Sequence, residues 1–308
     1  MRVLNINGGI GRVICSSGSI REGDVVISSS PEMLRGLGAK VYPLQTPYIY
    51  EDIVKDNEYI EPEPYNCADY YRDQHHLCQV FNKLINGVDE YVAPRIVLTK
   101  NELIEARTFV AERKIILYQP WGSMGGFCLG DKKMENVKED ESYRSLGTEF
   151  AKKLYNELSK DYTVFVIKAD QQVGFGSQCN TFQQQDVRKI IALIPYVKAV
   201  VGCDSFLHHA SAALGSPVPT IVLWAGTSEK NLGYSTQTNL RGKECIPSPN
   251  RIPHNHDYFV DKNRGVNEFS DETLTKVMEA VNDTSRIAPA LRTVDDSSGD
   301  NPKPSYGM

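Results

Sequence analysis

The sequence predicts an α/β protein, because short β-rich runs alternate along most of the chain with stretches of helical periodicity. Its 308 residues suffice for one large domain or two smaller ones, and the pattern restarts with a strand near Lys114. We therefore expect two Rossmann-like domains, at 1–112 and 113–285, with a ligand-binding cleft between them. The tail at 286–308 is rich in Ser, Pro, Asp and Gly and is predicted to be disordered.

In the first domain, strands are expected where β-branched residues cluster, and helices where apolar residues recur three or four positions apart. The expected strands cover 2–7, 24–28 and 40–44. Helices are expected at 31–37, with a proline in the first turn, and at 73–85, which ends at Asn86-Gly87. The Pro- and Tyr-rich stretch 47–65 is expected to be irregular.

A helix is expected before the second half begins. It starts with a capping box of Thr99 and Glu102 and ends near Arg113. A polar stretch, 124–141, is expected to be a loop. The expected strands cover 114–119, 163–168, 199–202 and 219–224. The expected helices cover 146–158, 183–194, 205–214 and 271–281.

Composition points to a soluble protein of the cytoplasm, or of the host cytoplasm if the protein is viral. The net charge of −5 provides no global attraction to nucleic acid or to anionic membranes. Seven cysteines without a C-x-x-C pair indicate reduced thiols. The first residues are too few and too polar for a signal peptide. No apolar run reaches the roughly 20 residues that span a bilayer, so we expect peripheral membrane contact at most.

The segment 200–217 carries the most chemical information. A buried strand ends at Asp204-Ser205, a helix of small residues follows, and Gly215 stops it. Asp204 or Ser205 can cap this helix, whose free N–H groups and dipole then suit an anion such as a diphosphate. His209, about one turn into the helix, can donate to a phosphate oxygen when protonated. The alternative is an ordinary strand-cap-helix unit with core histidines.

This segment resembles the donor-site signature of the heptosyltransferase-type glycosyltransferases of family 9, Asp-Ser-Gly-Pro-x-His-x-Ala-x-Ala-Leu-Gly. It matches at Asp204, Ser205 and His209 and at the end of the small-residue run, whereas Phe206-Leu207 replaces Gly-Pro. The next strand leads to Gly226-Thr227, where the family has Gly-Pro-Thr. The resemblance implies a GT-B-like fold whose second domain binds a nucleotide sugar through the following residues: Asp204, Ser205, His209, Gly226 and Thr227.

Two segments upstream also resemble the family. Pro120-Trp121-Gly122-Ser123 is similar to the Pro-Gly-x-Ser that opens the C-terminal domain, which implies that Ser123 contacts the donor. The helix expected at 146–158 resembles the next family helix, which a phosphate-binding cation usually precedes. Arg144 is the nearest cation and would offset the charge of the departing nucleoside diphosphate. A solvated loop arginine is the alternative.

The glycine-rich turn after the first strand resembles the family's acceptor side. Its glycines, Gly8, Gly9 and Gly11, allow the backbone to approach a ligand. The family commonly has Gly-Asp-Val here, and its aspartate is the expected general base. Arg12 stands in that place and cannot deprotonate an alcohol, so we expect it to bind a phosphate or an anionic acceptor. The sequence does not choose among the candidate bases: Asp24, Asp52, Asp73, His75 and His76.

No metal and no cofactor besides the nucleotide-sugar co-substrate are expected. The pair His208-His209 and the later His254, His256 and Cys245 match no standard zinc spacing. The sequence also lacks an apolar-flanked Asp-x-Asp, which marks metal-bound diphosphate in the other major glycosyltransferase fold.

The sequence therefore predicts metal-independent transfer of a hexosyl, heptosyl or pentosyl group from a nucleotide diphosphate sugar to an acceptor hydroxyl. The resemblance implies a glycan or lipid-linked sugar as acceptor. A first domain shorter than in typical members leaves a hydroxylated base of viral DNA open, although DNA binding should demand a basic face. Arg12 motivates a second alternative, a nucleotide-sugar-binding protein without transfer activity. A nucleotide-sugar epimerase would share the architecture. The sugar, the nucleotide, the acceptor and the oligomeric state are not fixed by the sequence.

Overall fold

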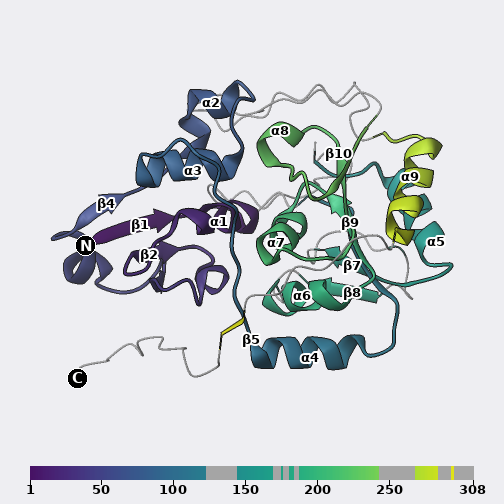
Figure 1. The fold of residues 1–308 in the computed structure, drawn as a ribbon, viewed down its shortest axis with the longest axis horizontal. Coiled ribbons are helices and arrows are strands. Elements are labelled where there is room, and N and C mark those ends of the chain that lie inside the picture. Colours follow the sequence, from purple (N-terminus) through teal and green to yellow (C-terminus); the bar gives the residue numbers. More distant parts are fainter. Residues whose placement is uncertain are drawn as a thin grey trace, which may run out of the picture.

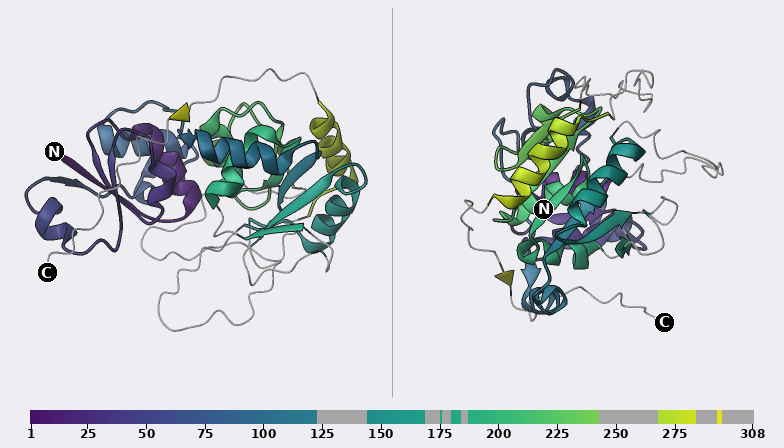
Figure 2. Two further views of the ribbon diagram at one scale, coloured as in Figure 1. Left: turned by 90° about the horizontal axis from the view of Figure 1, so that it is seen from below. Right: turned by 90° about the vertical axis from the view of Figure 1, so that its right-hand side faces the viewer.

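The computed structural model describes residues 1–122, 144–168, 175, 180–183, 187–242, 268–283 and 293–294. It confirms the predicted α/β fold with two parallel sheets, which lie side by side along the long axis of the molecule (Figures 1 and 2). The loop predicted at 124–141 lies outside the described residues, as does the tail at 286–308 apart from 293–294. Among the described residues, no helix is both long and apolar enough to cross a membrane.

The N-terminal sheet has the strand order β3-β2-β1-β4, and every pairing is parallel. Its strands are β1 (Arg2–Ile6), β2 (Val25–Ser28), β3 (Lys40–Pro43) and β4 (Glu58–Ile60). Its helices are α1 (Ile10–Ser16), α2 (Ala68–Tyr71) and α3 (Leu77–Asn86). Short 3-10 or π turns occupy Ser17–Ser19, Pro31–Leu34, Tyr50–Val54 and Pro64–Asn66.

The C-terminal sheet has the order β11-β10-β9-β6-β7-β8, again parallel throughout. Its strands are β6 (Ile115–Gln119), β7 (Thr163–Lys168), β8 (Asn180–Gln183), β9 (Ala199–Cys203), β10 (Thr220–Trp224) and β11 (Thr238–Arg241). Relabelled in chain order this is 6-5-4-1-2-3, the doubly wound Rossmann order. The order reverses between β6 and β9, and ligands of such sheets bind outside the carboxyl ends of the strands at that point.

Helices cover both faces of the C-terminal sheet. They are α5 (Thr148–Leu158), α6 (Val187–Leu193), α7 (Phe206–Leu214), α8 (Glu229–Leu232) and α9 (Asp271–Asn282), with a 3-10 turn at Ile194–Tyr196. Alternate strand residues such as Ile116 and Val201 pack with α5 and α9 on the outer face. Their neighbours, such as Leu117 and Val200, join α6 and α7 in a core that continues into α1 and α3 of the N-terminal half. The two halves therefore share one hydrophobic core.

The connection between the sheets runs through β5 (Leu98–Thr99) into α4 (Lys100–Val110). The predicted capping box is present: the Thr99 side chain accepts from the Glu102 N–H, and the Glu102 carboxylate accepts from the Thr99 N–H. β5 pairs with β12 (Thr293–Val294). α4 packs against α6 and so lies with the second sheet, although it precedes the predicted domain boundary at residue 112.

Several elements differ from the sequence prediction, among them the 3-10 turn Pro31–Leu34 in place of the helix expected at 31–37, and the unpredicted α2, α8 and β11. The stretch 47–65, expected to be irregular, contains β4, which pairs with β1 along the edge of the sheet. The helix expected at 183–194 begins at Val187, and the residues before it include β8. The helix expected at 73–85 begins at Leu77, because His76 takes the N-cap position and its Nδ1 accepts from the Cys78 N–H. It ends as predicted, with Gly87 in the left-handed region at φ 68°.

Candidate functional site

The carboxyl ends of β6, β9 and β10 bring three predicted segments together. In the sheet register, Gln119 stands opposite Gly202, and Leu223 stands opposite Cys203. The residues that follow these strands therefore meet at one edge of the sheet, at the point where the strand order reverses. They include Trp121, Asp204, Ser205, Gly226 and Thr227. Ser123 lies outside the described residues.

The start of α7, the helix predicted to bind an anion, lies at this edge. Ser205 is the N-cap with extended backbone (φ −158°), and its side chain makes no capping hydrogen bond. The first N–H groups of the helix thus lack a side-chain cap, and the helix dipole adds positive potential there. Ser205 therefore takes the N-cap position, but the predicted side-chain cap is not formed, and its hydroxyl does not occupy the donors that an anion would use.

Buried polar atoms without a partner gather at the same edge. Within the described part of the chain, the amide of Gln119, Nε1 of Trp121, Oδ2 of Asp204 and the hydroxyls of Thr227 and Ser228 have no hydrogen-bond partner. All five residues are less than a tenth exposed. An unpaired buried polar group costs about 1–3 kcal/mol. Five such groups therefore gather at the carboxyl edge of a Rossmann sheet, and each calls for an explanation.

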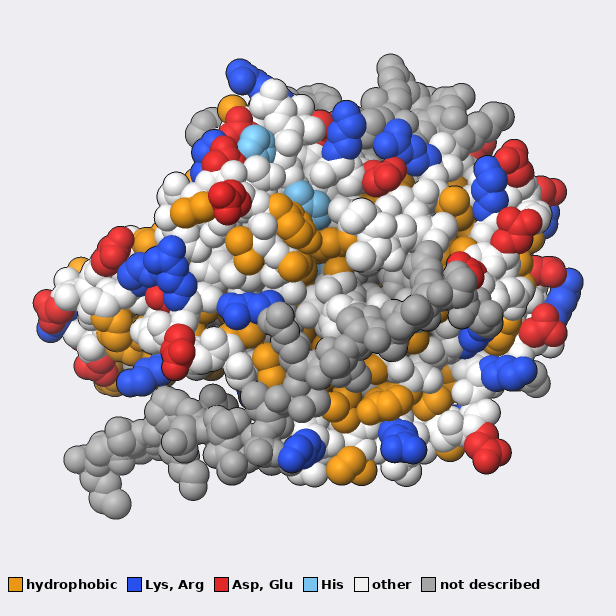
Figure 3. All heavy atoms as spheres, in the orientation of Figure 1, with side chains coloured by type: hydrophobic (Ala, Val, Ile, Leu, Met, Phe, Trp, Pro, Cys, Tyr) orange, Lys and Arg blue, Asp and Glu red, His pale blue; other side chains and the backbone are white. Residues whose placement is uncertain are grey.

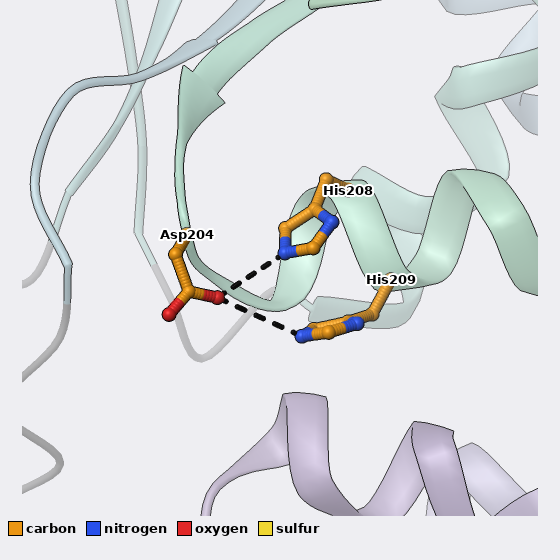
Figure 4. Close-up of side chains that lie close together, drawn as sticks. All are labelled: Asp204, His208 and His209. Carbon is orange, nitrogen blue, oxygen red and sulfur yellow. Dashed lines mark hydrogen bonds and ion pairs between the residues drawn. The ribbon is translucent and has the colours of Figure 1, made fainter. Parts of the chain in front are cut away.

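Asp204 is the centre of the charged residues here. Its Oδ1 lies 3.2 Å from His208 Nε2 and 3.8 Å from His209 Nε2, and its Oδ2 lies 4.0 Å from Arg144 Nη1 (Figure 4). Burial raises the pKa of Asp204, but the neighbouring His208 and the charge of Arg144 lower it more, so the pKa falls below its usual range. The structure thus unites Asp204, His209 and Arg144, as the sequence predicted.

His209 also joins the two domains. Its Nδ1 lies 2.9 Å from the Tyr234 hydroxyl and 3.4 Å from Cys15 Sγ on α1. Burial lowers the pKa of His209, but the neighbouring Cys15 raises it by a larger amount. The pKa of His209 therefore lies above its ordinary value. Tyr234 and Cys15 were not predicted as site residues. Neither has a local sequence signal, because their contacts join segments far apart in the chain.

The glycine turn of the first domain faces α7. Gly8 has φ +117°, a conformation that side chains rarely adopt, and Ser29 Oγ donates to its carbonyl at 3.0 Å. A Cβ on Gly11 would stand 2.7 Å from His209 Cδ2 and 3.7 Å from Phe206 Cα, so a side chain there would displace the His209 ring. Gly9 has open space around it. The turn therefore meets α7 from the other half of the molecule, as predicted.

Arg12 is held within its own domain. Its Nη1 donates to Glu63 at 3.0 Å, its Nη2 donates to the Pro62 carbonyl at 2.9 Å, and its guanidinium lies over the rings of Tyr65 and Phe81. The side chain is 13% exposed. Phosphate or acceptor binding by Arg12 stays a prediction, and it would require Arg12 to share its donors with Glu63.

Among the predicted bases, the structure does not bring Asp24 to this site. Asp24 precedes β2 and binds Arg2 at 2.7 Å, which places it at the amino ends of the strands, opposite the glycine turn. His75 Nε2 lies 2.8 Å from Asp89 Oδ1 in a separate charged group. Asp52 is exposed in the π turn, and Asp73 lies beyond α2. His76 alone of the five contacts the domain junction, with its ring centroid 4.9 Å from that of Tyr234.

Comparison with known proteins gives the fold class. No family model matches the chain, and no curated protein matches it in sequence. Among solved structures, a glycosyltransferase of family 9 from Veillonella parvula DSM 2008 is similar, with TM-score 0.62, 10% identity and coverage of 91% of this chain and 96% of the other. The ADP-heptose lipopolysaccharide heptosyltransferase II of E. coli has TM-score 0.59, 12% identity and coverage of 91% and 98%.

A third structure, the E. coli heptosyltransferase WaaC with ADP, has TM-score 0.53, 11% identity and coverage of 91% of this chain and 100% of the other. At these identities the similarity establishes the fold. The chain has the two-domain, GT-B-like α/β fold of these glycosyltransferases, which confirms the fold that the resemblance at 204–215 implied.

Proposed function

We propose that this protein transfers a sugar from a nucleoside diphosphate sugar to an acceptor hydroxyl. The observation that carries the proposal is the group of buried, unpartnered polar atoms around Asp204 and the start of α7. This group lies where a Rossmann sheet binds its ligand. The similarity to glycosyltransferases of the same fold supports it.

The proposed chemistry needs positive potential at the leaving group. The acceptor oxygen forms a bond to the anomeric carbon while the bond from that carbon to the diphosphate breaks, and the acceptor proton passes to a base. Negative charge then accumulates on the departing nucleoside diphosphate. The N–H groups at the start of α7 and the guanidinium of Arg144 are placed to stabilise it. Gly11 approaches His209 closely, so the other domain bounds the proposed site on this side.

Adenosine diphosphate is the first nucleotide to test. One structure similar in fold, the dodecameric iron-containing heptosyltransferase TibC, is in complex with ADP-D-beta-D-heptose, and WaaC is with ADP. The likeness is to the fold, so uridine, guanosine and cytidine diphosphates belong in the same panel. The acceptor that we propose is a hydroxyl of a glycan or of a lipid-linked sugar, and the place of reaction is the cytoplasm.

A thermal-shift panel of nucleoside diphosphates and nucleotide sugars tests the donor site. We expect one nucleotide at 100 times its Kd to stabilise the wild-type protein by about 2.7 kcal/mol. The ligand-induced shift should vanish in Asp204→Ala and His209→Ala, and persist in the control Asp271→Ala, which changes an exposed residue of α9. The shift is compared within each variant, so a lower starting melting temperature does not hide the result. Equal shifts in all four proteins would contradict the assignment.

One observation favours a second candidate, a nucleotide-sugar-binding protein without transfer activity. Arg12 stands where the family has its aspartate and is bonded to Glu63 and Pro62. Release of nucleoside diphosphate from the bound donor separates the two, because only the enzyme produces it. DNA as acceptor gains no such support: in the face shown in Figure 3, acidic and basic side chains are interspersed over the N-terminal half.

A further inference from the structure

His208 has a fixed tautomer. The Gln237 side-chain N–H donates to the His208 carbonyl oxygen at 2.8 Å, which turns the other end of that amide, Oε1, toward His208 Nδ1 at 3.3 Å. Oε1 can only accept, so Nδ1 must carry the proton. Both side chains are buried: His208 is 3% exposed and Gln237 is 8% exposed. Water therefore does not offer a substitute partner.

This tautomer creates a conflict at Nε2. In the neutral ring, Nε2 then carries a lone pair, and it points at the carboxylate oxygen Oδ1 of Asp204 at 3.2 Å (Figure 4). Nε2 of His209 lies 3.8 Å from the same oxygen. Two acceptors at hydrogen-bond distance in a buried place repel each other unless a cation, either a proton or a metal ion, lies between them.

The arrangement of the neighbouring charges and rings disfavours a proton as this cation. The two imidazole rings are only 3.9 Å apart between centroids, so two charged rings would repel. Arg144 already places one positive charge beside Oδ2 of the same carboxylate.

We propose that Asp204, His208 and His209 bind a divalent transition-metal ion of the zinc type. Each of these three buried residues offers one ligand atom, and the three atoms all lie within 4.8 Å of one another. Zinc bonds of about 2.0–2.2 Å at tetrahedral angles place neighbouring ligand atoms about 3.3–3.6 Å apart. The separations from Oδ1, 3.2 and 3.8 Å, bracket this spacing.

The surroundings of the three ligands have the form of a metal site. Ligating histidines usually donate their other ring N–H to an oxygen, and here Gln237 Oε1 faces Nδ1 of His208 while the Tyr234 hydroxyl faces Nδ1 of His209. His209 would bind the metal through Nε2 and would carry its own proton on Nδ1. Asp204 Oδ2 has no hydrogen-bond partner among the described residues. The fourth position is open to water or, on the proposed function, to a donor phosphate oxygen.

The site was not expected from the sequence, because two adjacent histidines on one helix match no standard zinc spacing. His208 also occupies a position that the family signature leaves variable. The structure offers a useful contrast in a second group, Asp69, His75 and Asp89. There Lys83 Nζ lies 2.7 Å from Asp69 and 3.0 Å from Asp89, so an ammonium already provides the cation.

Binding of Co²⁺ to the chelator-treated, nucleotide-free protein tests the proposal. We expect one equivalent per chain with the intense visible bands of four-coordinate cobalt, displaced by Zn²⁺, and a higher melting temperature with the metal. His208→Gln should lose the bands and the shift, whereas Asp89→Asn in the contrasting group should keep both. Circular dichroism of His208→Gln establishes that it is folded, and Gln237→Leu, which frees the His208 tautomer, should weaken Co²⁺ binding at least tenfold.

Absence of stoichiometric Co²⁺ binding to the wild type would overturn the proposal, as would wild-type binding by His208→Gln. Nitrogen NMR showing a doubly protonated His208 ring at neutral pH in the metal-free protein would identify the cation as a proton and overturn it too. The nucleotide panel is repeated with chelator present. Nucleotide binding without metal binding defeats only this proposal, and metal binding without nucleotide binding defeats only the proposed function.

Discussion

Replacing Arg144 with alanine is expected to slow release of nucleoside diphosphate from the donor by a factor of about 10² to 10³. Arg144 Nη1 lies 4.0 Å from Asp204 Oδ2, at the side of the carboxylate that faces away from the two histidines. In the proposed reaction its guanidinium stabilises charge that develops on the leaving diphosphate, so kcat should fall more than the affinity for donor. The measurement is steady-state turnover of the nucleotide sugar, with water as acceptor until the sugar acceptor is known.

Two further variants make this result specific. Arg144→Lys retains the charge without the planar guanidinium and should recover part of the lost turnover. Lys152→Ala removes a half-exposed cation on the outer side of α5 and should leave turnover unchanged. If Arg144→Ala turns over donor as fast as Lys152→Ala, Arg144 has no role at the leaving group.

Replacing Arg188 with alanine should lower the free energy of unfolding by about 2–3 kcal/mol, because it leaves a mostly buried carboxylate without its partner. Arg188 on α6 donates through Nε and Nη2 to both oxygens of Glu102 on α4, and also to the carbonyls of Val97 and Glu32. It thus joins both halves of the molecule to the connection between them. Some exposure, 13% for Arg188 and 26% for Glu102, holds the expected loss below that of a fully buried pair.

Urea unfolding monitored by tryptophan fluorescence measures this loss. The neighbouring Lys189 is exposed, so Lys189→Ala should change stability by no more than about 0.5 kcal/mol. A comparable change in both variants would show that the contacts of Arg188 contribute nothing specific.

The same ion pair predicts a pH dependence. Burial raises the pKa of Glu102, but the Arg188 hydrogen bond and then the Thr99 N–H lower it more, so the folded-state pKa lies below the unfolded one. The stabilisation is therefore fully present above the unfolded pKa, about 4.3, and is lost as the pH falls through the folded-state value. The stability difference between wild type and Arg188→Ala should accordingly be constant near neutral pH and shrink below about pH 4.

Local chemistry explains which parts of the fold could be predicted. Thr99 and Glu102 define a helix start by their own hydrogen bonds, and the runs at β6 and β9 are apolar enough to be strands in any context. β4 and β8 could not be predicted in the same way. Their residues include Glu58 and Asn180, which have low strand propensity, and they are strands because each adds to the edge of a sheet already built.

The residues of the candidate site also differ in whether the sequence could predict them. Asp204 and His209 were predictable because one strand-turn-helix segment positions both. Gln237, Tyr234 and Cys15 were not, because only the folded chain brings them to the two histidines. Asp24 shows the opposite case: it was singled out by its position in the sequence, but Arg2 holds its side chain at the other end of the strands.

A crystal structure with the nucleoside diphosphate that gives the largest thermal shift tests the central claim most directly. We predict that the diphosphate lies at the start of α7, within hydrogen-bond distance of its first N–H groups and of Arg144, with Thr227 or Ser228 newly hydrogen-bonded to the ligand. A nucleotide bound away from the carboxyl ends of β6, β9 and β10, with those buried hydroxyls still unpaired, would contradict the donor site and the function built on it.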